Sequence, residues 1–263
     1  MQKLIWKKYS QERRTLKNLA VEYDKDVKWV RKQLSLATTT VKKINPGGLV
    51  MIADVTFFGR GYGYIVFRSP RLKKNLYYKF IPYETITEYY QGRYELEQSG
   101  FKISAMVLDG RPGVRNVFYD IPVQMCQFHQ KQIVKRYLTS NPKLEAGIEL
   151  RKITSELCNE NKKDFTDKLN RWYERWKIFL KEKTYEPNLK NWHYTHGRLR
   201  SAYRSLTKNL PYLFTYLDYP ELDIPNTTNS LDGSFSHLKE LVRIHRGFND
   251  ELKHKLIESI LTN

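Results

Sequence analysis

The 263-residue chain has little cysteine and no long hydrophobic run. Its two cysteines, Cys126 and Cys158, are too few for a disulfide framework or a four-cysteine zinc site, so we expect a reducing, cytoplasmic compartment. No stretch approaches the roughly 18 apolar residues that a transmembrane helix requires. The opening residues, MQKLIWKKYSQERR, lack the apolar core of a secretory signal.

Acidic residues are also scarce. The chain has 28 Asp and Glu against 46 Lys and Arg, which gives a formal net charge of +18. Such a surplus repels itself on the surface and is tolerated most easily beside a polyanion. An anionic membrane is the weaker candidate, because the sequence has no amphipathic basic anchor and no lipidation signal. We therefore expect a nucleic-acid partner and no membrane partner, with a merely solubilising charge as the alternative.

The pattern of glycine and proline divides the chain. Residues 1–44 contain no glycine and read as a basic helical block, and Asn45-Pro46-Gly47-Gly48 then predicts a domain boundary. The expected domains are thus 1–44 and 45–263. Short apolar runs predict strands at 49–53, 62–67, 75–81, 103–108 and 122–126, with a helix over 84–99. From residue 127 the pattern is helical, with long helices within 143–182 and 196–217 and a last pair over 229–243 and 249–261. This order favours an α/β protein with a mixed sheet flanked by helices.

Two short helices are predicted within the basic front block. Leu16, Leu19 and Ala20 share one face of the first, and Val30 and Leu34 share one face of the second. Asp26 is suited to cap the second helix, although Asp24 and Lys25 occupy turn positions where glycine and an apolar residue are common. The spacing fits a helix-turn-helix. We expect the second helix to direct the following side chains toward DNA phosphates and base edges: Lys28, Arg31, Lys32 and Gln33. An ordinary helical hairpin with a solvated basic face is the alternative.

Two aspartates stand at the ends of separate apolar strands. Asp54 follows Met51-Ile52-Ala53, and Asp109 follows Met106-Val107-Leu108. A single aspartate at a strand end is usually a turn former. If the two strands are neighbours, both carboxylates emerge at one edge and are suited to share Mg²⁺ or Mn²⁺. Two such ions stabilise the attacking and leaving oxygens of a phosphoryl transfer.

A third carboxylate is expected from a later helix. The segment after Pro225, beginning Asn226-Thr227-Thr228-Asn229, opens a helix that carries Asp232 early and Glu240 further along. Asp232 is the first candidate and Glu240 its rival.

Cys126 and His129 form a CxxH motif. The spacing suits zinc, but only Cys158 and distant histidines are left to complete four ligands. We favour a structural cysteine at a strand end with a histidine packed near the site.

A helical region further along contains Trp172, Tyr173 and Trp176. We interpret these aromatic residues as part of the core of that region, in preference to a platform for stacked bases.

In combination, these motifs resemble a known family. The helix-turn-helix, strand-Asp54, strand-Asp109-Gly110, Cys126-Gln127-Phe128-His129 and Thr227-Thr228-Asn229-Ser230-Leu231-Asp232 occur in the order found in bacterial insertion-sequence transposases related to the Mutator group. The segment Val242-Arg243-Ile244-His245-Arg246-Gly247 is also similar to the family. The resemblance covers about residues 15–260.

The resemblance implies a DDE transposase with a ribonuclease-H-like catalytic domain. It implies a five-stranded mixed sheet, an all-helical insertion at about 130–225, and two Mg²⁺ or Mn²⁺ ions held by Asp54, Asp109 and Asp232. Asp232 stands where the family has glutamate. Arg243 and Arg246, with the front block, would bind double-stranded DNA.

The expected activity is metal-dependent phosphodiester hydrolysis and strand transfer at mobile-element ends. Bringing two ends together would require a homodimer or a larger assembly, in the bacterial cytoplasm at the nucleoid. A non-catalytic DNA-binding protein derived from a transposase is the alternative, and a processing nuclease on the same fold is a third possibility.

Overall fold

The computed structural model describes residues 1–37, 48–187, 191–245 and 250–262. Contacts divide the chain into two compact units. Unit 1 comprises Met1–Gly48, Asp54–Lys102 and Asn229–Asn263, and unit 2 comprises Leu49–Ala53 and Ile103–Thr228. Of the predicted boundary Asn45-Pro46-Gly47-Gly48, the first three residues lie outside the described residues and Gly48 begins a strand.

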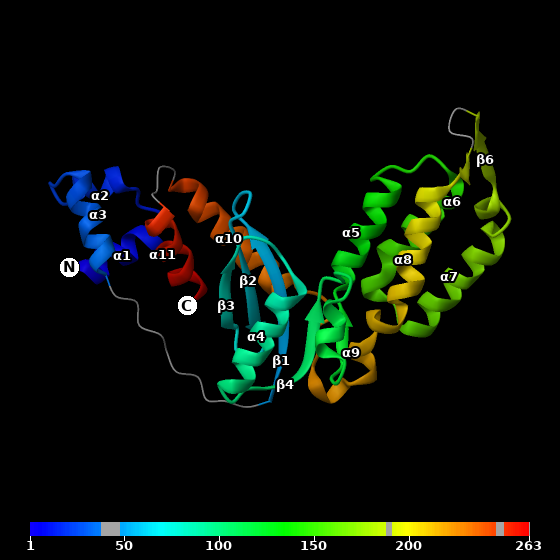
Figure 1. The fold of residues 1–263 in the computed structure, drawn as a ribbon, viewed down its shortest axis with the longest axis horizontal. Coiled ribbons are helices and arrows are strands. Elements are labelled where there is room, and N and C mark those ends of the chain that lie inside the picture. Colours follow the sequence, from blue (N-terminus) through cyan, green and yellow to red (C-terminus); the bar gives the residue numbers. More distant parts are fainter. Residues whose placement is uncertain (38–47, 188–190, 246–249, 263) are drawn as a thin grey trace. The chain divides into compact units, whose positions relative to one another are not determined.

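A five-stranded mixed sheet has the strand order β3-β2-β1-β4-β5 (Figure 1). The strands are β1 (Gly48–Phe57), β2 (Gly63–Ser69), β3 (Lys74–Ile81), β4 (Lys102–Leu108) and β5 (Val123–Met125). All five predicted strands are therefore present. Strand β1 belongs to both units, since its residues Leu49–Ala53 are part of unit 2 and the strand returns to unit 1 at Asp54.

The sheet combines both kinds of pairing. Strands β2 and β3 are antiparallel, with a register shift between Phe67 and Arg68, whereas β4 and β5 are parallel. Between β1 and β2, the Phe58 amide donates to the Tyr62 carbonyl at 2.8 Å. A connection this short joins neighbouring strands as a hairpin, because parallel strands need a long crossover.

Helix α4 (Ile86–Gln98) packs on β2 and β3 through Tyr89, Gly92 and Leu96. A Cβ built on Gly92 would lie 2.5 Å from Cε2 of Phe67, a side chain with no exposed surface. Glycine at this position therefore allows the helix to approach the strand closely.

Three short helices open unit 1: α1 (Gln2–Ser10), α2 (Leu16–Glu22) and α3 (Val27–Leu36). The Asp26 carboxylate accepts from the Trp29 amide at 2.7 Å, so the predicted cap of α3 is confirmed. Asp24 adopts a left-handed φ of 51°, which aspartate tolerates better than most residues.

These helices share a hydrophobic core with the end of the chain. Helices α10 (Asn229–Ile244) and α11 (Asp250–Leu261) are the predicted last pair, and α11 adds Leu252 and Leu256 to the core formed by α1–α3 (Figure 1). The Lys255 ammonium also donates to the Leu34 carbonyl at 2.7 Å and to the Ser35 carbonyl at 2.5 Å. The Leu34 carbonyl also accepts from the Ala37 amide, so the lysine adds a second donor there and supplies one to the Ser35 carbonyl at the end of α3.

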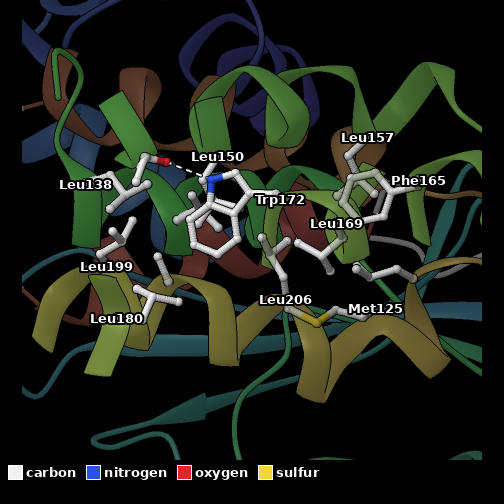
Figure 2. Packing of buried hydrophobic residues seen from close by; sticks show 14 of the residues in the cluster. Met125, Leu138, Leu150, Leu157, Phe165, Leu169, Trp172, Leu180, Leu199 and Leu206 are labelled. Atoms are coloured by element: carbon white, nitrogen blue, oxygen red, sulfur yellow. Dashed lines mark hydrogen bonds between the residues drawn. The ribbon is translucent and has the colours of Figure 1, made fainter. Parts of the chain in front are cut away.

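Unit 2 is mainly helical beyond β5. It contains α5 (Gln127–Leu138), α6 (Glu145–Glu156), α7 (Lys162–Trp176), α8 (Gly197–Leu213) and α9 (Thr215–Asp218), together with short 3-10 turns at Val114–Phe118, Leu157–Asn159, Phe179–Lys181 and Pro220–Leu222. Its core joins Met125 of β5 to residues of α5–α8 (Figure 2).

Trp172 lies in the middle of this core, as predicted. Its side chain is 3% exposed, and the indole nitrogen donates to the Ala146 carbonyl at 2.9 Å (Figure 2). Tyr173 and Trp176 pack against the same cluster. The interpretation of this aromatic group as core is confirmed.

The prediction of an all-helical region over 130–225 is wrong. Strands β6 (Lys183–Glu186) and β7 (Asn191–Tyr194) form an antiparallel hairpin within it. Their β-branched and aromatic residues, Thr184, Tyr185, Trp192 and Tyr194, favour extended backbone. In the parts of the chain that the structure covers, no helix has the length and hydrophobicity to cross a bilayer.

Candidate functional site

Asp54 is an acidic residue within the apolar strand β1. Its neighbours Met51, Ile52 and Ala53 are buried, and Asp54 itself is only 9% exposed. One carboxylate oxygen accepts from the Val55 amide at 2.7 Å. Burying an ionised carboxylate is unfavourable unless other groups compensate the charge, so this position is consistent with a bound cation.

Asp232 lies in the first turn of α10, where its charge interacts favourably with the helix dipole. Within unit 1, one carboxylate oxygen of Asp232 lies within 4.8 Å of one of Asp54. A buried strand and the start of a distant helix therefore bring two of the three predicted acids together.

Glu240, the rival to Asp232, has a different environment. Its carboxylate forms an ion pair with Nη2 of Arg13 at 3.2 Å, and its side chain is 38% exposed. With a rise of about 1.5 Å per residue, it lies roughly 12 Å further along α10 than Asp232. The structure therefore associates Asp232, and not Glu240, with Asp54.

Asp109 belongs to unit 2 and directly follows β4. Its Oδ1 accepts from the Arg111 amide at 2.9 Å, which is the local turn typical of aspartate. Gly110 has a φ of +94°, and a Cβ there would lie 2.3 Å from Cε of Met125. The loop that carries Asp109 is thus fixed by its own hydrogen bond and by a position that only glycine suits.

A cavity of about 890 Å³ opens beside Asp109 within unit 2. The loop after β4, α5 and α8 line it with basic side chains, namely Arg111, Arg115, Arg136, Arg204 and Lys208. Neither Arg115 nor Lys208 was predicted as a site residue. The two come from distant segments and belong to no motif, so only the folded arrangement identifies them.

No known protein family and no curated protein matches this chain. The arrangement of the side chains themselves is therefore the basis for the functional conclusion.

Cys126 and His129 contact one another and Thr228. The Cys126 sulfur lies 3.3 Å from both the Thr228 hydroxyl and the Thr228 amide, and that hydroxyl lies 3.4 Å from Nδ1 of His129. Burial raises the pKa of the Cys126 thiol, but hydrogen bonds to His129 and Thr228 outweigh burial and lower it overall. Within the described ranges, no group of three potential metal ligands includes Cys126. The hydrogen bonds of the thiol to His129 and Thr228 agree with the structural interpretation of the cysteine.

The predicted DNA-contacting residues of α3 differ in exposure. Lys28, Arg31 and Lys32 are exposed, as expected. Gln33 is buried with 9% exposure, so the prediction that it points away from the apolar face is wrong. The reason is its spacing, because Gln33 lies three residues after buried Val30 and positions three apart share a helix face. Gln33 supports the packing of α3 and is removed from the DNA-reading set.

The two arginines near the end of α10 were also predicted to contact DNA. Arg243 is exposed in the last turn of that helix. Arg246 lies outside the described residues. Of this pair, Arg243 alone has a described position that suits contact with a large anion.

Proposed function

We propose that the protein is a DDE-type DNA transposase, which hydrolyses a phosphodiester at a mobile-element end and transfers the freed strand to target DNA. The observation that carries the proposal is the approach of the Asp54 and Asp232 carboxylates within 4.8 Å in unit 1. The order of the motifs along the sequence and the basic composition support the same activity.

The donor chemistry of this pair fits Mg²⁺ or Mn²⁺. Two ionised carboxylates at this separation repel each other, and a divalent cation between them replaces repulsion with attraction. Carboxylate oxygens are the hard ligands that these ions prefer. We propose Asp54 and Asp232 as ligands, with Asp109 as the third acid that the resemblance to the family implies. Two bound ions would supply charge stabilisation for the attacking and leaving oxygens.

The chain's own residues would position the DNA. The exposed Lys28, Arg31 and Lys32 of α3 are suited to hold the element end through phosphates and base edges. The short turn between α2 and α3 and the Asp26 cap support a helix-turn-helix. Two ends must be brought together for transposition, so the proposal includes a homodimer or a larger assembly.

The observed sheet is compatible with the ribonuclease-H-like fold that the proposal requires. Strand β1, which contains Asp54, neighbours β4, which Asp109 follows. Neighbouring strands that each contribute an acid near one end are a suitable scaffold for the shared ions. Because the segment after β5 contains the β6–β7 hairpin, the proposed insertion is predominantly, not entirely, helical.

A strand-transfer assay tests the proposal. The substrate is a supercoiled plasmid carrying the genomic DNA found on each side of the coding sequence, incubated with the purified protein and Mg²⁺. We expect joined products, and a loss of at least about a hundredfold in Asp54→Asn, because a charged ligand is removed. Glu240→Gln is the matched control on α10 and should keep near-normal activity. Unchanged activity in Asp54→Asn would reject the proposed site.

The non-catalytic alternative is favoured by one observation, the presence of Asp232 where the family has the longer glutamate. Binding of Mn²⁺ separates the two functions, since a protein that only binds DNA has no need of it. We expect saturable Mn²⁺ binding in the wild type and weaker binding in Asp232→Asn. If Mn²⁺ binds equally to both proteins while DNA binding persists, the non-catalytic function is the better description.

A further inference from the structure

We infer that the basic cavity of unit 2, lined by Arg111, Arg115, Arg136, Arg204 and Lys208, is a groove for the phosphate backbone of the DNA next to the phosphate that is cut. This inference rests on the proposed function and deepens it. It assigns a part of the substrate to a surface on which Asp109 is the one proposed catalytic acid.

The charged residues that line the cavity are almost all basic. Asp109 is its only acidic lining residue, against five basic ones. Among the residues that the structure describes, Arg136, Arg204 and Lys208 form no ion pair. Unneutralised cations around a concave surface produce a positive potential that attracts an anion.

The opposite pattern holds elsewhere in unit 2. Lys168 pairs with Glu156 and Glu160, and Arg175 pairs with Glu145 and Glu149. Acidic residues of α6 and of the segment before α7 therefore neutralise cations on α7, whereas the cavity stays positive. A charge that served only solubility would have no reason to be concentrated in this way.

Arg115 is the best-organised cation of the cavity. Its Nη2 donates to Oδ1 of Asn209 at 2.5 Å, and its guanidinium lies 4.2 Å from the centre of the Tyr212 ring. Asn209 in turn donates to Gln130 at 2.7 Å, and Gln130 donates to Ser205 at 3.1 Å. This network holds the guanidinium in place before a ligand binds, and its five donors exceed what these contacts use.

The neutral lining residues point to the same ligand. Ser201, Ser205 and Asn116 contribute hydroxyl and amide groups to the cavity beside the arginines and the lysine. Arginine, lysine, serine and asparagine are the side chains that commonly contact phosphate and sugar without reading sequence. Arg204 and Lys208 lie one turn apart on α8, so they offer two successive charges along the groove. An extended chain of phosphates uses both, whereas a small anion needs only one.

Binding of a fluorescein-labelled 30-base-pair duplex of random sequence, measured by anisotropy across a KCl series, tests the inference. Each phosphate contact contributes about 0.9 to the slope of log K against log salt. We expect R204Q/K208Q to lower that slope by roughly 1.8. The matched control is K163Q/R171Q on α7, which removes the same charge from exposed positions outside the cavity. The control should bind like the wild type, and R204K/K208R should restore binding.

The outcomes separate this inference from the proposed function. Equal slopes for R204Q/K208Q and the control overturn the groove while strand transfer by the wild type still supports the transposase. A lower slope only in R204Q/K208Q supports the groove. Because backbone contacts do not read sequence, this variant should weaken binding to the genomic flanking DNA and to random DNA by the same factor. A loss confined to the flanking DNA would also overturn the groove. If the wild type binds neither DNA, the proposed function fails together with the groove.

Discussion

At the scale of single residues, Asp54 and Gly110 show how local chemistry limits substitution. Asp54 is a buried acid whose charge must be compensated, and Gly110 adopts a backbone conformation that other residues rarely occupy. The place of the first on a strand could be predicted from the apolar residues before it. The second could be predicted only as a turn residue, because its contact with Met125 depends on the neighbouring strand β5.

Gly110→Ala should lower the free energy of unfolding by about 1–3 kcal/mol, since it adds strain at φ +94° and a clash with Met125. Urea denaturation measures the change. Gly197→Ala is the control in the same unit, because a Cβ there meets open space. Its stability should stay within about 0.5 kcal/mol of the wild type. An equal loss in both variants would contradict the role assigned to Gly110.

His245 is a second residue whose environment has a measurable consequence. Its ring lies 4.1 Å from the Tyr9 ring, and burial lowers its pKa below 6.5 although a backbone hydrogen bond with Tyr9 opposes the shift. The unfolded chain then binds a proton at a higher pH than the folded chain. The contribution to stability is therefore present above pH 6.5 and is lost as the pH falls through 6.5 toward the folded pKa. His245→Phe should show a smaller fall in melting temperature between pH 7.5 and 5.5, and an identical fall would contradict this assignment.

At the scale of helices and strands, α4 shows how packing can reverse an intrinsic propensity. Alanine in place of an exposed helical glycine normally stabilises by about 1 kcal/mol. At Gly92 the added Cβ would meet the buried ring of Phe67 and Cε1 of Tyr77, at 2.5 and 2.9 Å. The contact with the sheet, and not the helix itself, therefore decides the sign of the effect.

Gly92→Ala should destabilise unit 1 by about 1–3 kcal/mol, because the crowded helix must move away from β2. Gly233→Ala on α10, where a Cβ has no neighbour within 4 Å, is the control and should be neutral or stabilising by up to about 1 kcal/mol. Thermal melts of both variants distinguish the cases. A stabilised Gly92→Ala would show that α4 does not pack as described.

The elements that follow a clear hydrophobic pattern could be predicted from the sequence. The apolar runs of β1, β2 and β4 are buried, so a run of apolar residues was enough to predict each strand. The β6–β7 hairpin could not be predicted in this way, because almost all of its residues are exposed and show no alternation. Asp54 and Asp232 could be selected as a pair from motifs, whereas the setting of Arg115 depends on contacts with Asn209 and Tyr212 from a distant helix.

At the scale of the whole chain, the first and last helices depend on each other. Helices α1–α3 were predicted as a domain of their own, and the structure adds α11 to their core. The sequence of α11 does not predict that it packs on α1–α3, because its apolar face would fit any complementary surface. Helix α3 is thereby attached to the C-terminal part of unit 1.

Leu256→Ala tests this attachment. The side chain has no exposed surface, so its truncation should cost about 2–5 kcal/mol and increase tryptic cleavage within residues 1–37. Leu36→Ala on α3 is the control, because this leucine is 51% exposed. Limited proteolysis followed by mass spectrometry identifies the cleaved bonds. If residues 1–37 stay equally protected in Leu256→Ala, they fold without support from α11.

The division of strand β1 between two units has a consequence for synthesis on the ribosome. Unit 1 is assembled from three separate stretches of the chain, and its last stretch begins at Asn229. During translation all residues of unit 2 are therefore synthesised before unit 1 is complete. Asp54 can pair with Asp232 only when translation is nearly finished. A protein cut short before that point would carry the front helices and all five strands of the sheet without the paired acids, so only translation past Asp232 could yield the proposed catalyst.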